Sequence, residues 1–195
     1  MITLASTSAA RRALLTHAGL DVAFANPGVD EAAVKPSLLA DNMRPRDIAD
    51  ALAELKAVKL SRRTAGLVIG ADQTVDLGGE LIDKAPDLAT LRSTLTAMRG
   101  RDHKLHSAVV VAENGQPVWR LVKTARLTVR SFSDEWLDAY MAACGEQVLS
   151  AAGGYHLEGL GVQLFSTIDG DYFTILGLPL VELLDYLRLR GEIAS

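Results

Sequence analysis

The stretch from Leu67 to Lys84 restricts the fold more than any other part of the chain. It begins with the apolar run Leu67-Val68-Ile69, which is too short for a helix and therefore predicts a buried strand. Asp72 follows where the run ends. The pair Gly78-Gly79 then predicts a turn, and a short return strand leads to Lys84. The sequence thus places an acid, Asp72, at the end of a core strand, and a hairpin is expected to bring Lys84 back toward it.

This pairing of Asp72 with Lys84 suits chemistry on phosphate groups. A carboxylate can hold a hard cation or activate water, and a lysine can neutralise phosphate charge. The alternative is a surface hairpin in which Asp72 caps a turn, since short strand-turn units are common.

The N-terminal segment offers a second candidate site for an anion. Residues 2–5 predict a strand, Ser6-Thr7-Ser8 a turn, and residues 9–18 a helix that Ser8 caps. The free N–H groups at such a helix start can bind phosphate. Arg11 and Arg12 lie in the first turn, where the helix dipole disfavours cations, which indicates an anionic partner. The alternative is that both arginines are simply solvated.

Two further segments contribute charged candidates. Val29-Asp30-Glu31 follows a predicted strand over 20–25 and is interpreted as a loop, in which adjacent acids are usually solvated. The following stretch looks disordered until Pro45, which begins a helix with Ile48, Leu52 and Leu55 on one face. Lys56 and Lys59 flank that face and would normally extend to solvent.

The remaining segments predict one α/β unit. Helices are expected to begin after Asp87 and Ser133 and at Pro179, and strands are expected over 105–112, 118–129, 162–168 and 172–176, with Asn114-Gly115 as a hairpin turn. Neither a repeat nor a low-complexity linker interrupts the pattern, so a single domain over residues 1–195 is the simplest interpretation.

Composition excludes several classes of function. The 195 residues carry a net charge of −4, which argues against a broad basic surface for nucleic acid. Apolar stretches fall short of the roughly 20 residues that span a bilayer, and the N-terminus does not resemble a secretory signal. The single cysteine, Cys144, excludes an internal disulfide and fits a reducing compartment, so a cytoplasmic protein is expected. The histidines lack the spacing of a zinc site.

Several of these segments together resemble the Maf family of nucleoside triphosphate pyrophosphatases. The matching segments, which fall in the family's order and spacing, are LASTSAARRALL, VDE, ALAELKA, IGADQTV followed by Lys84, RGRDHKLHSAVVV, AAGGYHLEGLG and DGDYFTILGLPL. The resemblance covers essentially the whole chain.

The resemblance implies an α/β fold with an elongated mixed sheet, flanking helices, and a central cleft between two lobes. The implied reaction cleaves a nucleoside triphosphate between its α and β phosphates with the help of a divalent metal, Mg²⁺ or Mn²⁺. By position, Asp72 would be the general base or a metal-linked carboxylate, and Glu31 would assist at the metal or the substrate. The other implied substrate-binding residues are Ser6, Arg11, Lys56 and Lys84. A homodimer is plausible for such a protein.

Three positions relate to the choice of nucleobase: Ala10, Gln73 and Glu158. The pairs Asp72-Gln73 and Glu158-Gly159 resemble the branch that acts on 7-methyl-GTP, whereas the dTTP/UTP branch usually has Asp-Thr and Gln-Gly. A carboxylate at Glu158 could accept hydrogen bonds from guanine N1–H and its amine. Departures from the family pattern are Ala10, Ala85, Ser107, Ala151 and Thr174.

The sequence therefore predicts a cytoplasmic, metal-dependent nucleotide pyrophosphatase acting on 7-methyl-GTP or another modified nucleotide. One alternative is a dTTP/UTP-type enzyme of the same family. The other is a non-catalytic regulator of septum formation whose cleft senses a nucleotide. Neither nucleic acid nor a membrane is expected as a partner.

Overall fold

The computed structural model describes residues 1–194, which form an α/β fold around one open, mixed sheet of seven strands. The strands are β1 (Ile2–Ala5), β2 (Val22–Ala25), β3 (Leu67–Leu77), β4 (Glu80–Ile82), β5 (Asp102–Glu113), β6 (Gln116–Val129) and β7 (Phe165–Asp169). Their order across the sheet is β2-β1-β3-β5-β6-β7, with β4 paired to β3. β1 is parallel to both neighbours, and the other pairs are antiparallel.

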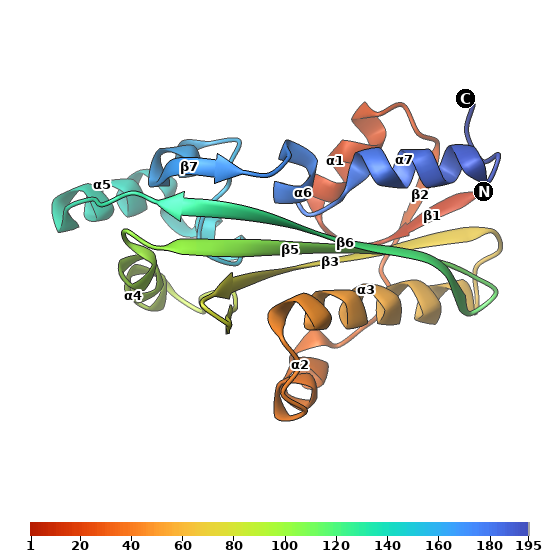
Figure 1. Cartoon of the computed structure of the whole chain (residues 1–195), viewed down its shortest axis with the longest axis horizontal. Coiled ribbons are helices and arrows are strands. Elements are labelled where there is room, and N and C mark those ends of the chain that lie inside the picture. Colours follow the sequence, from red (N-terminus) through yellow and green to blue (C-terminus); the bar gives the residue numbers. More distant parts are fainter. Residues whose placement is uncertain (195) are drawn as a thin grey trace.

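The molecule is elongated because β3, β5 and β6 run through most of its length (Figure 1). β5 and β6 form a long hairpin whose turn is Asn114-Gly115, as the sequence predicts. Both turn residues have positive φ, 51° and 77°, which is the conformation that Asn-Gly favours in tight hairpins. The long strands thereby connect two separate hydrophobic cores, one near each end.

Helix α3 (Pro45–Ser61) covers one face of the sheet at unusually close range (Figure 1). The contact is made of small residues, with Ala49, Ala53 and Ala57 packed against Ala108, Val110 and Ala112 of β5. Gly70 of β3 lies so near that an added Cβ would be 2.2 Å from the carbonyl oxygen of Ala53. Of the predicted apolar stripe, Ile48 and Leu52 are buried, whereas Leu55 is exposed.

The opposite face carries α1 (Ala9–His17), α6 (Tyr172–Ile175) and α7 (Leu180–Leu189) (Figure 1). Leu14, Leu15, Leu183 and Leu187 from these helices pack with strand residues such as Ile69 in the first core. Ser8 caps α1 by accepting from the N–H of Arg11 at 3.4 Å, as predicted. Pro179 is the N-cap of α7, next to the predicted start of that helix.

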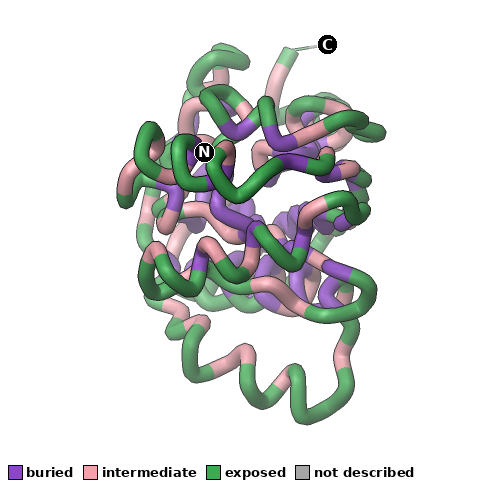
Figure 2. Tube along the Cα trace, turned by 90° about the vertical axis from the view of Figure 1, so that its left-hand side faces the viewer, coloured by how far each residue is buried: buried purple, intermediate pink, exposed green. Residues whose placement is uncertain are grey.

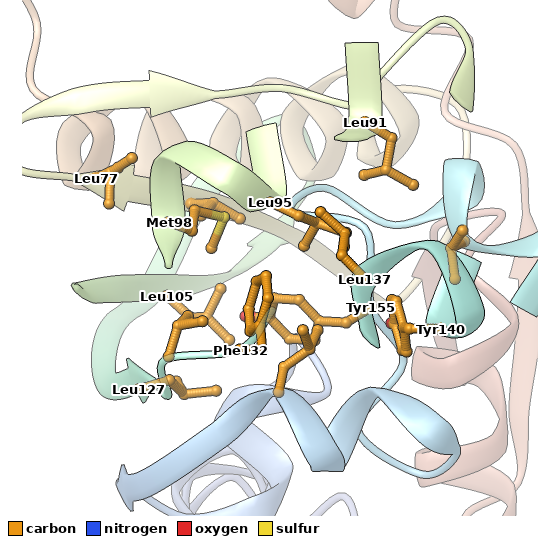
Figure 3. Packing of buried hydrophobic residues seen from close by; sticks show 14 of the residues in the cluster. Leu77, Leu91, Leu95, Met98, Leu105, Leu127, Phe132, Leu137, Tyr140 and Tyr155 are labelled. Atoms are coloured by element: carbon orange, nitrogen blue, oxygen red, sulfur yellow. The ribbon is translucent and has the colours of Figure 1, made fainter. Parts of the chain in front are cut away.

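The second core lies at the other end of the long strands, beneath α4 (Leu88–Met98) and α5 (Asp134–Cys144). Figure 3 shows leucines of this core together with Met98, Phe132, Tyr140 and Tyr155. Asp87 and Ser133 cap the two helices, as the sequence predicts. Two 3₁₀ helices, Gly145–Ser150 and Leu160–Leu164, flank the glycine-rich segment at this end.

Two predicted strands near the C-terminus were wrong in whole or in part. Residues 172–175 form helix α6, not a strand, because Asp171 caps them by accepting from the N–H of Thr174 at 2.9 Å. The expected strand over 162–168 begins only at Phe165, since residues 160–164 form a 3₁₀ helix. At α6, the Asp171 cap therefore prevails over the short apolar run that predicts a strand.

The stretch after Glu31 was also misinterpreted, because it forms helix α2 (Glu31–Ala40). Asp30 caps this helix and Glu31 is its first residue, so the expected loop ends one residue earlier. None of the α2 residues is buried, and Pro36 lies inside it. The helix forms the lowest segment in Figures 1 and 2, and Figure 2 colours it as exposed or intermediate. A helix without an apolar face gives no periodic signal to detect.

Among the described residues, no helix is both long and apolar enough to cross a membrane.

Candidate active site

The site is organised by a gap along one edge of β3. β1 pairs with β3 only as far as Gly70, and β4 pairs with β3 from Val75 onward. Residues 71–74 thus lie between these two partners, next to the turn that follows β1. Parallel strands commonly bind ligands where their carboxyl ends meet. A cavity of about 460 Å³ opens here.

Every site residue expected from the sequence lines this one cavity. The set comprises Ser6, Ala10, Arg11, Glu31, Lys56, Asp72, Gln73, Lys84 and Glu158. They come from β1–α1, α2, α3, the β3–β4 hairpin and the glycine-rich segment. Asp72 is buried, so the alternative of a surface hairpin at this residue is wrong. Glu31 is still 39% exposed at its side chain, although it also pairs with Lys56.

Lys56 forms the centre of the site's ion pairs. Its Nζ lies 2.6 Å from Asp72 Oδ1 and 2.6 Å from Glu31 Oε1. The side chains of Lys56 and Asp72 are each 7% exposed. The expectation of a solvent-directed lysine is correct only for Lys59, which is exposed and donates to the carbonyl of Gly28. Lys56 points inward because it is one turn from Leu52 on the buried face of α3.

Burial and neighbouring charge act differently on the two carboxylates. Burial raises the pKa of Asp72 above its ordinary value, although Lys56 and Arg11 oppose the rise. Burial also acts to raise the pKa of Glu31, but Lys56, Lys35 and Arg11 outweigh it and hold that pKa below its ordinary value. Of the two, Asp72 is therefore the better proton acceptor.

The two neighbouring arginines have different roles. Arg11 lines the cavity and donates from Nε to the carbonyl oxygen of Gly177 at 2.7 Å. Its burial lowers its pKa, and the charges of Asp72 and Glu31 oppose that shift. Arg12 instead donates to the carbonyl of Ser6 at 3.0 and 3.2 Å and lies over the ring of Phe24. Arg11 thus contributes its charge to the site, and Arg12 fixes the turn before α1.

Gln73 connects the site to α6. Its Nε2 lies 2.8 Å from Ser107 Oγ, 3.1 Å from the carbonyl of Thr174 and 3.0 Å from that of Ile175. Ser107 itself donates to the Thr174 carbonyl at 2.6 Å. The amide nitrogen is thus engaged within the protein, and its carbonyl oxygen is the end suited to meet a ligand.

Another part of the cavity wall comes from the glycine-rich segment, with Tyr155, His156, Leu157 and Glu158. The Tyr155 side chain is fixed by a hydrogen bond, because its hydroxyl lies 2.7 Å from Nε2 of buried His103. Burial lowers the pKa of His103 to about 4, so this histidine is neutral at pH 7. A fixed aromatic ring and an exposed carboxylate suit the ring and the polar edge of a planar ligand.

Sequence reasoning missed two charged residues of the cavity wall, Lys35 and Asp83. Lys35 was missed because α2 was taken for a disordered stretch. The spacing of Glu31 and Lys35, four residues apart, is the signal that would have found it.

Asp72 and Glu31 are also the residues expected to hold a metal. Within residues 1–194, no group of three or more His, Cys, Asp or Glu side chains could hold an ion. Mg²⁺ is usually bound by one or two carboxylates together with waters and substrate phosphates. The residues present therefore fit a cation that the substrate helps to hold, and do not form a complete protein cage.

This arrangement can bind a strongly anionic ligand and supply a proton acceptor beside it. Arg11, Lys35, Lys56 and Lys84 bring positive charge to the cavity, and Asp72 is the buried carboxylate among them. Cations that neutralise an anion while a carboxylate orients water are the requirements of hydrolysis at phosphorus.

Comparison with known proteins identifies sequences similar to nearly the whole chain. A family model described as Maf-like protein matches residues 1–190. A "Nucleoside triphosphate pyrophosphatase" of Caulobacter vibrioides is 60% identical over 192 residues, which are 98% of this chain and 96% of that protein. A protein of the same description from Hyphomonas neptunium is 46% identical over 189 residues, 97% of this chain and 96% of that protein. A "7-methyl-GTP pyrophosphatase" of Rhizobium meliloti is 46% identical over 194 residues, 99% of this chain and 98% of that protein.

Proposed function

The chain belongs to the Maf-like family, and on that premise we propose that it is a nucleoside triphosphate pyrophosphatase. Its reaction would convert a nucleoside triphosphate and water into the monophosphate and pyrophosphate. The observation that carries this proposal is the contact of Lys56 with both Asp72 and Glu31 in a cavity that Arg11 and Lys84 also line.

In the proposed reaction, Asp72 accepts a proton from the attacking water. The water oxygen bonds to the α-phosphorus, the bond from that phosphorus to the bridging oxygen breaks, and pyrophosphate leaves. A carboxylate whose pKa is raised by burial is a better base than an exposed one. Arg11, Lys56 and Lys84 neutralise the phosphates, which would otherwise repel the nucleophile. A divalent cation, Mg²⁺ or Mn²⁺, would supply further charge neutralisation, with Asp72 and Glu31 as its protein ligands.

Among substrates, we propose 7-methyl-GTP or a related modified purine nucleotide. Guanine presents two donors on one edge, N1–H and the amine, and the carboxylate of Glu158 can accept from both. Thymine and uracil place one donor between two carbonyl oxygens, which a carboxylate would repel. The Rhizobium meliloti relative, described as a 7-methyl-GTP pyrophosphatase, supports the same choice. A cytoplasmic location and a homodimer stay predictions.

The deciding experiment measures pyrophosphate and orthophosphate released from 7-methyl-GTP, GTP, dTTP and UTP with Mg²⁺ or Mn²⁺. We expect pyrophosphate, and loss of at least about 100-fold in kcat for Asp72→Asn, as is common when a general base is removed. Equal turnover by that variant would remove Asp72 from the mechanism. Tight nucleotide binding without any product in saturating metal would instead favour a nucleotide-sensing regulator.

The choice of base is tested separately by Glu158→Gln. We expect this variant to lose preference for 7-methyl-GTP and to gain relative activity on dTTP and UTP, because an amide can donate to a pyrimidine carbonyl. An unchanged ranking of the four substrates would reject the assigned role of Glu158 and leave the reaction itself unaffected.

A further inference from the structure

Lys35 of α2 is a cation of the cavity wall that the proposed reaction does not yet use. Its Nζ lies 2.8 Å from Asp83 Oδ1 and 4.0 Å from Glu31 Oε2. The Lys35 side chain is 19% exposed, whereas that of Asp83 is 54% exposed. A mostly covered lysine thus points into the site and is paired with a carboxylate that lies largely in solvent.

Lys35 extends the ion pairs of the site into a line of alternating charge. The order along this line is Asp83, Lys35, Glu31, Lys56 and Asp72. Lys35 is thus separated from Lys56 by one carboxylate and lies further from Asp72 than Lys56 does. A phosphate chain whose α-phosphorus faces Asp72 would bring its distal phosphates toward the Lys35 end.

A phosphate group could readily replace Asp83 as the partner of Lys35. Asp83 lies largely in solvent, which screens its attraction to Lys35, so breaking this pair costs less than breaking a fully buried one. Phosphate oxygens carry more charge than a single carboxylate and form strong charge-assisted hydrogen bonds with lysine. No residue of α2 is fully buried, so Lys35 belongs to a helix at the surface of the molecule.

We propose that Lys35 binds the departing pyrophosphate and that Asp83 competes with it for the same ammonium group. In the free protein, Asp83 forms the ion pair with Lys35. When the triphosphate binds, its distal phosphates take the place of Asp83, and the original pair re-forms as pyrophosphate leaves. This inference rests on the proposed pyrophosphatase function and adds a product-binding residue, Lys35, and its competitor, Asp83, to it.

The test is calorimetric binding of inorganic pyrophosphate in the presence of Mg²⁺, which does not depend on turnover. Lys35→Met should weaken binding about tenfold, as expected for one charge-assisted hydrogen bond. Asp83→Asn should tighten binding several-fold, because it frees Lys35 and removes a repelling charge. A merely structural pair would give the opposite result for Asp83→Asn, because both changes would then loosen α2 and weaken binding.

The double variant separates Lys35 from the adjacent Lys84. In the Lys35→Met background, Asp83→Asn should tighten binding much less, because only the repelling charge is then removed, and an undiminished gain would overturn the proposal. Unchanged binding by Lys35→Met, or a wild-type protein that does not bind pyrophosphate at millimolar concentration, would overturn it as well. Arg92→Met is the matched control, since it breaks an exposed 2.9 Å pair with Asp138 away from the cavity lining and should leave binding unchanged.

The same measurements distinguish failure of the proposed enzymatic function from failure of the role proposed for Lys35. If the wild-type protein releases no pyrophosphate from any triphosphate but binds pyrophosphate with these opposite effects, the role of Lys35 stands and the enzymatic proposal falls. If pyrophosphate is released and the KM of the triphosphate is the same in Lys35→Met, the enzymatic proposal stands and Lys35 is excluded.

Discussion

At the scale of single residues, Lys56 is the neighbouring charge that acts most strongly on the pKa of both Asp72 and Glu31. It is the cation between two carboxylates, and the side chain of one of them, Asp72, is only 7% exposed. Removing one partner of a buried pair leaves an uncompensated charge, which costs far more than the intact pair contributes. Arg11 remains as a second cation near both acids and limits that cost.

We predict that Lys56→Met lowers the free energy of unfolding at pH 7 by about 3 kcal/mol, the lower end of the range for a broken buried pair. This loss in the free energy of unfolding should become smaller as the pH falls. Without Lys56 the folded-state pKa of Asp72 rises further above its unfolded value of 3.8, so the folded protein binds more protons than the unfolded chain. Stability of the variant therefore increases as the pH is lowered toward that value.

Urea unfolding of Lys56→Met and of the wild-type protein at pH 7 and pH 5 measures this difference. Lys59→Met is the control, because Lys59 lies about one turn further along the same helix at an exposed position. This variant should change the free energy of unfolding by less than about 0.5 kcal/mol. Lys56→Met and the wild-type protein could instead differ equally in free energy of unfolding at both pH values. That result would contradict the view that the lost stability comes from unpaired carboxylates.

At the scale of elements, the distance between α3 and β3 decides whether Lys56 reaches Asp72. Gly70 permits that distance, since an added Cβ would lie 2.2 Å from the carbonyl oxygen of Ala53 and 2.6 Å from the amide nitrogen of Ala57. Both are backbone atoms, so the helix as a whole would have to move. The close packing of small residues thus positions the central ion pair.

We predict that Gly70→Ala destabilises the protein by about 1–3 kcal/mol, the usual cost of overpacking. For a chain of this length, each kcal/mol lowers Tm by roughly 2–4 °C. The displaced helix should also reduce kcat, because Lys56 and Asp72 separate. Thermal unfolding and steady-state kinetics measure the two effects. Gly159→Ala serves as a control, since its Cβ would lie 3.9 Å from its nearest neighbour, and normal stability of Gly70→Ala would refute the packing argument.

At the scale of the whole molecule, the two cores are joined through β3, β5 and β6. Leu95 lies in the core beneath α4 and α5, and Leu183 in the core beneath α1 and α7. The cavity wall takes residues from both ends, including Ser6 and Tyr155. We propose that the two ends unfold together as a single domain, because the long strands would lose partners at both ends at once.

Leu95→Ala should therefore lower the stability of the entire protein by about 2–5 kcal/mol, and Leu183→Ala should do the same. The two tryptophans provide a local probe at each end. Trp119 stacks on Tyr186 near the first core, and Trp136 packs against the second. In single-tryptophan variants, either leucine substitution should shift both fluorescence transitions to the same midpoint. Two separate midpoints would show that the ends are independent domains.

Much of the fold and nearly all of the site could be predicted from the sequence. The start of the strand at Leu67, the caps at Ser8, Asp87 and Ser133, and the Asn-Gly hairpin depend on neighbouring residues, so local chemistry is sufficient to identify them. The expectation that this strand ends at Asp72 was wrong, because β3 continues to Leu77 and Asp72 lies within it, paired with β5. The resemblance to the Maf family then supplied the candidate residues, from Ser6 to Glu158, which the structure brings to one cavity.

What the sequence could not decide depends on contacts between distant segments. Helix α2 lacks an apolar stripe, and α6 has only four residues, so neither produces a periodic pattern long enough to detect. The pairing of Lys35 with Asp83, 48 residues away, exists only because α2 lies beside the β3–β4 hairpin. The sequence by itself determined which residue types are present and where several strands, helices and turns begin. The tertiary structure decided which charges meet, because a distance of a few ångströms between remote segments depends on the packing of the whole sheet and its helices.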